Sequence, residues 1–284
     1  MTTNYHTHSS FCDGQGRPQH YAEYAFSRGF YALGFSGHAP LPFPNSWTMD
    51  EENLLEYIGE VLELKKHYKD SLEIYLGLET DYFDEKHNPA NPKYDALGLD
   101  YKIGSVHHLY SPERKEFMSV DYSREELNTL LNETFKGDIK ALVSEYYKRV
   151  REMVQTGGFE ILGHLDLIKK HNRDNAYFDE AEEWYAREIQ KTLEAIAGSD
   201  VILEINTGAM ARGYTDEPYP SPWIIDRAAE LEIPVTINSD AHKPEWLDYC
   251  FEEAESLARA SGYTSKMVLS EGKWKEVGME GGWI

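Results

Sequence analysis

Two histidines near the beginning of the chain are separated by a single residue. In Tyr5-His6-Thr7-His8, the two imidazoles would project to the same face of a β-strand, because residues i and i+2 of a strand point the same way. Asp13 follows five residues after His8. Two imidazoles side by side suit a bound metal ion. Two histidines close to a terminus can also be simply solvated, so this segment alone leaves both interpretations open.

Seven short apolar segments alternate with helical patterns along the chain. The expected strands span residues 4–8, 32–38, 73–80, 101–107, 160–166, 201–207 and 234–240. Regular alternation of strands and helices predicts a parallel sheet with helices outside it. Seven strands favour a closed or nearly closed α/β barrel, and an open doubly wound sheet is the alternative.

Helix starts are expected where capping residues precede an apolar pattern. Capping-box spacing occurs at Thr48 and Glu51, at Ser123 and Glu126, and at Asp179 and Glu182, and Pro222 follows Ser221 as at a helix start. No linker or change of composition divides the chain. We therefore expect a single domain over residues 1–284, with its core in 4–260 and a strand or hairpin in the tail, 261–284.

Polar side chains gather at the carboxyl ends of the expected strands, where parallel α/β folds place their working residues. Six of the eleven histidines fall there, with carboxylates between them. The nine candidate ligands are His6, His8, Asp13, His38, Glu79, His107, His164, Asp240 and His242. Without a cation, such a cluster would bury polar groups that lack partners, at about 1–3 kcal/mol each. Nine ligands require at least two divalent ions and fit three better, and imidazole with carboxylate suits Zn, Mn or Fe.

Composition limits the classes of partner. The formal net charge of −22 argues against binding nucleic acid, since phosphate contacts require Lys and Arg. Metal ions would still make a locally positive pocket for a small anionic substrate. The sequence contains no run of 18 apolar residues, so no membrane span is expected, and no secretion signal is visible in the first 30 residues. The two cysteines, Cys12 and Cys250, are too few for a disulfide framework, so a cytoplasmic location is expected.

The order of the motifs resembles a known superfamily. "HTHSSFCDG", "GFSGH", "GLETD", "GSVHH", "GHLD", "EINTGA" and "NSDAH" are similar, in that order, to the polymerase-and-histidinol-phosphatase (PHP) superfamily of metal-dependent phosphoesterases. The resemblance runs from His6 to about Glu245. It implies a distorted (β/α)7 barrel with the metal site at the carboxyl ends of the strands. Within the superfamily, "FCDG", "GFSGHAP" and "EINTGAMARGY" resemble the histidinol-phosphatase subgroup.

The resemblance also implies three ligand sets. The first metal would be held by His6, His8, Glu79 and Asp240. Glu79 would bridge to a second metal, completed by His107 and His164. Asp13, His38 and His242 would hold the third, although many superfamily members carry a histidine near the position of Asp13.

The expected reaction is hydrolysis of L-histidinol phosphate to L-histidinol and phosphate in histidine biosynthesis, by a hydroxide that bridges two metals. Asp240 or His171 would protonate the leaving alkoxide, while Glu79 would act as the bridging ligand. Cationic side chains near the rim are candidates for gripping the phosphate: Arg17, Arg212 and Lys243. Phe43 and Trp47 would form an aromatic wall, and Glu204, Asp81 or Asp84 would meet the substrate ammonium.

Other functions stay open. A PHP-type phosphatase could act on a phosphotyrosine protein or on another small phosphate ester, although residues 39–50 and 108–140 look able to close the rim. A nuclease is disfavoured by the charge and by the lack of a basic, aromatic groove. A partner-binding protein with a dead site would be expected to lack Glu79 or Asp240, and both are present.

Overall fold

Seven short strands form one parallel sheet that curves into a nearly closed barrel. The computed structural model describes the whole chain, residues 1–284. In sheet order the strands are β1 (Thr3–Asn4), β2 (Ala32–Phe35), β3 (Glu73–Asp81), β4 (Tyr101–Ser105), β7 (Ile161–Leu162), β8 (Ile202–Asn206) and β9 (Val235–Asn238). Every neighbouring pair is parallel. The expected (β/α)7 barrel is confirmed, and most of its strands are shorter than the sequence predicted.

The barrel closes between β9 and β1 with few ladder hydrogen bonds. The backbone N–H of His8 donates to the carbonyl oxygen of Ala241 at 2.9 Å, and the N–H of Ala241 donates to the carbonyl of His6 at 3.0 Å. Lower down, the Tyr5 N–H donates to Oδ1 of Asn238 at 2.8 Å. A side-chain amide thus replaces a ladder bond at the seam, immediately beneath the two first histidines.

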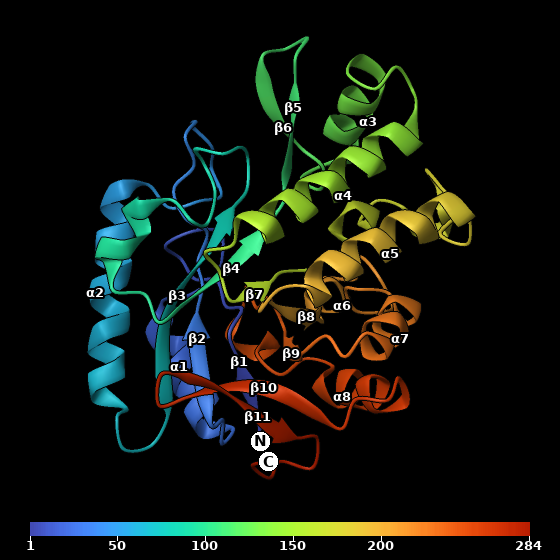
Figure 1. Ribbon diagram of the computed structural model, residues 1–284. Coiled ribbons are helices and arrows are strands. Elements are labelled where there is room, and N and C mark those ends of the chain that lie inside the picture. The colour runs from blue at the N-terminus through green and yellow to red at the C-terminus, as the bar shows by residue number, and fades with distance from the viewer.

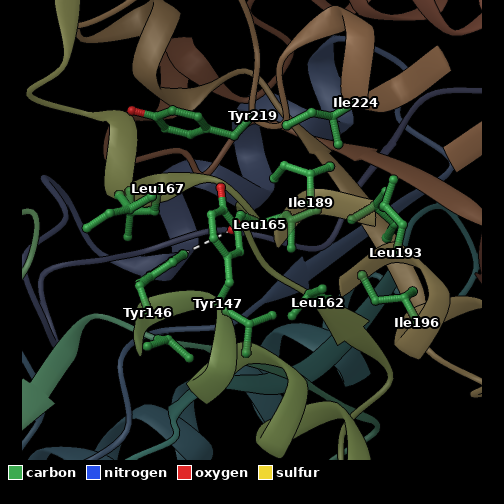
Figure 2. Close-up of a cluster of buried hydrophobic side chains, with 14 of the residues drawn as sticks. Tyr146, Tyr147, Leu162, Leu165, Leu167, Ile189, Leu193, Ile196, Tyr219 and Ile224 are labelled. Atoms are coloured by element: carbon green, nitrogen blue, oxygen red, sulfur yellow. Dashed lines mark hydrogen bonds between the residues drawn. The ribbon is translucent and has the colours of Figure 1, made fainter. Parts of the chain in front are cut away.

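Helices cover the outside of the barrel (Figure 1). They are α1 (Pro18–Ser27), α2 (Glu51–His67), α4 (Ile139–Thr156), α5 (Glu183–Ala197), α7 (Pro222–Glu230) and α8 (Phe251–Ala260), with shorter or peripheral helices α3 (Arg124–Glu133) and α6 (Gly208–Ala211). Their inner faces pack onto the sheet. Figure 2 shows the largest cluster, in which Leu193 and Ile196 of α5 lie near Leu162, and the Tyr146 hydroxyl of α4 donates to the carbonyl of Leu165 at 3.1 Å.

The predicted helix starts are right in two of four cases. Ser123 caps α3 by accepting from the N–H of Glu126, and Ser221 precedes Pro222 at the start of α7. The start of α2 is capped by Asp50 rather than Thr48. The Asp179 prediction is wrong because its Oδ1 accepts from Ala181 N–H in a local turn, and α5 begins later, after Glu182.

Aromatic side chains fill the lower part of the barrel. Tyr101 projects inward from β4, and a Cβ added at Gly34 or Gly77 would meet the Tyr101 side chain at 2.4 or 2.5 Å. The two glycines on β2 and β3 therefore leave the space that this ring occupies. Tyr101 also contacts the ring of Tyr5 edge-on, at 5.9 Å between centroids. The barrel interior is thus packed below the histidine layer.

The two ends of the barrel differ. The chain ends in the predicted hairpin, β10 (Ser265–Ser270) and β11 (Lys273–Gly278), which lies at the lower end near both termini (Figure 1). At the upper end a second hairpin, β5 (His108–Ser111) and β6 (Glu116–Ser119), projects from the barrel beside α3. None of the helices is long and apolar enough to cross a membrane.

Candidate metal centre

Glu79 lies at the centre of the polar layer above the packed barrel. It stands near the end of β3 and is almost fully buried. Five imidazoles surround its carboxylate. The Oε2 atom lies 3.3 Å from Nε2 of His6, 3.5 Å from Nε2 of His8 and 2.9 Å from Nδ1 of His38. The Oε1 atom lies 2.9 Å from Nε2 of His164 and 3.5 Å from Nε2 of His107.

The remaining predicted ligands complete the same cluster. Oδ1 of Asp240 lies 3.1 Å from Nε2 of His8, and Oδ2 of Asp13 lies 3.1 Å from Nε2 of His242. The structure therefore brings together all nine residues that the sequence singled out as ligands. They come from the carboxyl ends of different strands and from the loops beyond them.

Three groups of these residues place ligand atoms close enough to share an ion. The groups are His8, Asp13, His38 and His242; His6, Glu79 and His164; and His6, His8 and Asp240. The first differs from the set that the resemblance implies because it includes His8, and the second differs because it contains His6 in place of His107. The His8 ring stacks on His242, with centroids 4.3 Å apart and planes inclined by 24°.

The donor set fits divalent cations. Several buried ligand atoms make no well-directed hydrogen bond, although His38 Nδ1 and Glu79 Oε2 lie only 2.9 Å apart: Nε2 of His6 and of His8, Nδ1 of His38, and Oε2 of Glu79. Leaving such atoms unpaired costs about 1–3 kcal/mol each. They face one another around a shared space and combine imidazole nitrogen with carboxylate oxygen, the donors that Zn, Mn and Fe take in proteins.

Two of the predicted ligands have backbones in the left-handed region. His164 has a φ of 21° and Asp240 a φ of 47°. This conformation costs free energy for a non-glycine residue, and residues that adopt it cluster at functional sites. Each follows the end of a strand, β7 or β9, so the turn re-aims its side chain from the strand direction into the cluster.

Two carboxylates outside the ligand set accept hydrogen bonds from imidazole rings of the cluster. Oδ1 of Asp81 accepts from Nδ1 of His107 at 2.8 Å, and Oε1 of Glu204 accepts from Nδ1 of His6 at 2.7 Å. Both carboxylates are buried. This arrangement leaves Nε2 of each ring directed toward Glu79, and such outer partners orient ligands in metal sites.

These surroundings perturb the protonation of the imidazoles. Burial opposes charge on His107, but Asp81 and Glu79 outweigh it and raise the pKa of His107 to about 10. Burial and the neighbouring His38 and His242 lower the pKa of His8 to about 3. Protons and cations therefore compete for the same nitrogens.

A cavity of about 270 Å³ opens above the cluster. Besides the ligands, its lining includes Trp47, Ser119, Asp121, Tyr122, Leu167, Lys170, Arg212 and Tyr214. Lys170 and Arg212 are its only lysine or arginine residues. Nη2 of Arg212 donates to Oδ2 of Asp240 at 2.8 Å, and Nη1 contacts Nδ1 of His242 at 2.9 Å. The guanidinium of Arg212 thus braces two predicted ligands at the cavity wall.

Sequence reasoning missed Lys170 and its partners. Lys170 follows the short 3-10 helix η2 (Leu167–Lys169), which begins after His164. Its Nζ donates to Oδ2 of Asp121 at 2.9 Å and lies 4.9 Å from the ring centroid of Tyr214. The only sequence signal was the short distance from the "GHLD" motif, because Asp121 and Tyr214 come from distant loops.

Three predicted substrate or proton-transfer residues lie outside this cavity. Arg17 turns outward at the start of α1 and pairs with Glu60 of α2. Lys243 places its Nζ 4.6 Å from the ring centroid of Trp246. His171 is turned away, since its Nε2 contacts the carbonyl oxygen of Asp121 at 3.0 Å. None of the three lines the cavity, so this geometry does not support the expected roles of Arg17 and Lys243 in gripping phosphate or of His171 as an acid.

The predicted aromatic wall belongs to a second cavity of about 670 Å³, which adjoins the first. Trp47, Ser119 and Tyr122 line both. Trp47 stacks on His108, with centroids 5.6 Å apart and planes inclined by 14°. Of these two cavities, Phe43 lines the second and not the first, and it packs edge-on against Phe83 at 5.5 Å.

The acidic residues expected to meet an ammonium are placed differently. Asp81 and Glu204 are buried and bonded to His107 and His6, so neither faces the cavities. Asp84 lines the second cavity, together with Glu116 and Glu126. Carboxylates and aromatic rings therefore meet around that cavity, a combination that suits a cationic group.

Comparison with known proteins gives a consistent set of similarities. Residues 4–208 match the PHP domain family. The chain is 31% identical to a probable histidinol-phosphatase of Deinococcus radiodurans, over 90% of this chain and 92% of that protein. It is 29% identical to the histidinol-phosphatase of Bacillus subtilis, over 87% and 96%.

A solved structure shares the fold. Histidinol phosphate phosphatase from Lactococcus lactis, crystallised with zinc, L-histidinol and phosphate, superposes with a TM-score of 0.72 at 22% identity. The match covers 96% of this chain and 98% of that one.

Proposed function

Because the chain belongs to the PHP domain family, we propose that it is a metal-dependent phosphomonoesterase that hydrolyses L-histidinol phosphate to L-histidinol and phosphate. One observation carries this proposal. Five imidazoles surround the buried Glu79 at a cavity, Asp240 lies 3.1 Å from one of them, and several buried ligand atoms make no well-directed hydrogen bond. The relatives that cover nearly the whole chain are histidinol-phosphatases by name. The reaction belongs to histidine biosynthesis.

Two to three divalent ions, Zn, Mn or Fe, are proposed for the nine ligands. His8, Asp13, His38 and His242 would hold one ion, and the groups that share His6 would hold the others. His107 would complete the set around Glu79, to which its Nε2 points. When bound, such ions lower the pKa of water and neutralise charge on phosphoryl oxygens.

The chain's own residues would bind and orient the phosphate. Lys170 has one hydrogen-bond partner, Asp121, so two of its three N–H donors stay free at the cavity. We assign it to a phosphoryl oxygen. Arg212 would act mainly by fixing Asp240 and His242, since its donors already point at them.

Asp240 is proposed to move the proton. Water adds to phosphorus, the phosphorus–oxygen bond to the alcohol breaks, and the water proton passes through the Asp240 carboxylate to the leaving alkoxide. Burial alone would raise the pKa of Asp240, but Arg212 and His6 outweigh it and hold that pKa well below its usual range. Asp240 is therefore ionised in the resting site.

The second cavity is proposed to receive the organic part of the substrate. L-Histidinol carries an ammonium and an imidazole, and the cavity offers rings from Trp47 and Phe43 and a carboxylate from Asp84. Turnover of L-histidinol phosphate by the metal-loaded protein tests the proposed function. Absence of phosphate release with Zn, Mn and Fe would overturn it.

A further inference from the structure

Glu204 is the most completely bonded carboxylate beneath the metal centre. It projects from β8 and is fully buried. Its Oε1 accepts from Nδ1 of His6 at 2.7 Å and from Nδ2 of Asn238 at 2.9 Å. Its Oε2 accepts from the backbone N–H of His164 at 2.9 Å and from Nδ2 of Asn206 at 2.9 Å. One side chain thus links four strands or their ends.

The four donors leave no room for a proton on Glu204. Two oxygens accept two hydrogen bonds each, which is the full capacity of an ionised carboxylate. Three of the donors cannot reverse. The His164 N–H belongs to the backbone, and the amides of Asn238 and Asn206 are fixed because their Oδ1 atoms accept from the backbone N–H groups of Tyr5 and Gly208, each at 2.8 Å.

His6 is the one donor that has an alternative. A neutral imidazole carries its proton on either nitrogen. With Nδ1–H held on Glu204, the lone pair lies on Nε2, which points toward Oε2 of Glu79 at 3.3 Å and Oδ1 of Asp240 at 3.8 Å. That nitrogen has no hydrogen-bond partner.

We propose that Glu204 is a positioning residue that sets which ring nitrogen of His6 faces the metals. Through His6 it controls metal occupancy of the two ligand groups that contain His6, the His6 sites, and not of the third group. The inference rests on the ligand groups of the proposed function. Glu204 bonds to His6 and His164 but to no member of the group formed by His8, Asp13, His38 and His242. Loss of the Glu204 charge should lower metal occupancy at the His6 sites and leave the third group occupied.

Glu204→Gln tests this with almost no change of shape. The glutamine oxygen would face the two fixed donors of His164 and Asn206, and its NH2 would then face Nδ1 of His6 and the single fixed donor of Asn238. His6 must then accept at Nδ1 and carry its proton on Nε2, directed at Glu79 and Asp240. A protonated nitrogen cannot bind a metal.

The matched control is Glu160→Gln. Oε2 of Glu160 accepts the backbone N–H of Lys102 from the neighbouring strand at 2.7 Å, as Glu204 does for His164, but Glu160 lies outside the ligand groups. Both variants and the wild type would be loaded with Zn²⁺ and compared by zinc content, chelator competition and histidine ¹⁵N NMR. None of these readouts requires turnover.

In the wild type, we expect His6 to bind zinc through Nε2 and to keep a proton on Nδ1. Glu204→Gln should weaken zinc at the His6 sites by roughly 10–100-fold, move the His6 proton to Nε2 and leave zinc at the His8–Asp13–His38–His242 group. Glu160→Gln should match the wild type. Unchanged zinc affinity in Glu204→Gln, or uniform loss from all sites, would overturn the inference.

A further outcome is independent of any variant. Coordination of zinc through Nδ1 of His6 in the wild-type protein would contradict the inference even if Glu204→Gln failed to fold. Should zinc bind as expected while L-histidinol phosphate is not hydrolysed, the proposed substrate fails and the role of Glu204 stands.

Discussion

Oδ1 of Asp81 and Nδ1 of His107 lie 2.8 Å apart, and both side chains are buried above the end of β3. The opposite nitrogen of the ring lies 3.5 Å from Oε1 of Glu79. Asp81 is two residues beyond Glu79, so one strand supplies both the central carboxylate and the group that aims a ring at it. Because residues i and i+2 of a strand point to the same face, β3 directs both carboxylates into the cluster.

Replacing Asp81 by Asn should therefore weaken the centre without removing a ligand. The amide can leave His107 in the wrong tautomer, and we expect metal affinity and kcat/KM to fall by roughly 10–100-fold. Turnover of Asp81→Asn would be compared with the wild type, and its metal content also with that of Asp84→Asn, whose side chain lies in the second cavity. Wild-type metal content in Asp81→Asn would show that His107 needs no such support.

Glu79→Gln should have the largest effect of any single change. The carboxylate faces five imidazoles, and an amide offers one oxygen where two are used. We expect turnover to be lost and the metal content to fall. Glu73→Gln, at the other end of the same strand, is the control. A fully active Glu79→Gln enzyme would refute the central position of this residue in the metal site.

Lys170→Met should raise KM more than it lowers kcat. Its free N–H donors face the cavity, and losing a contact to phosphate should weaken substrate binding about tenfold or more, ~1.4 kcal/mol. Lys170→Arg keeps the charge beside Asp121 and should recover much of the affinity. Lys243→Met should behave like the wild type, because that side chain lies on Trp246. Equal KM values for Lys170→Met and Lys243→Met would remove Lys170 from the phosphate site.

The organic part of the substrate should be recognised by Trp47, which lines both cavities. We expect Trp47→Ala to lower kcat/KM for L-histidinol phosphate by roughly 10–100-fold, ~1.4–2.7 kcal/mol, and for p-nitrophenyl phosphate by much less. Phe26→Ala, on the exposed outside of α1, provides the control. Equal losses on both substrates would mean that Trp47 supports the centre rather than selecting the substrate.

The sequence predicted much of this arrangement because strand ends are local features. His6 with His8, Glu79 and Asp240 each follow or lie in an apolar run, and parallel strands bring such ends to one edge. The candidate ligands, and an α/β barrel as the favoured fold, could therefore be derived from pattern and spacing, whereas the distorted (β/α)7 form was implied by the resemblance. The clustering of those ligands in space is a consequence of the barrel.

The surroundings of the cavity could not be derived in the same way. Arg17 and Lys243 are near the ligand motifs in sequence, but Arg17 pairs with Glu60 of α2 and Lys243 lies on the ring of Trp246. Lys170 reaches the cavity because Asp121 and Tyr214, from two distant loops, hold it there. The direction of a loop side chain depends on such long-range partners, which have no periodic signal.

Phosphate release from L-histidinol phosphate, by protein loaded with Zn or Mn, tests the central claim most directly. p-Nitrophenyl phosphate and a phosphotyrosine peptide would be run beside it. We predict that kcat/KM for L-histidinol phosphate exceeds the other values by about a thousandfold or more, ~4 kcal/mol of selective transition-state binding. Comparable slow rates on all three substrates would contradict the assignment to histidinol phosphate.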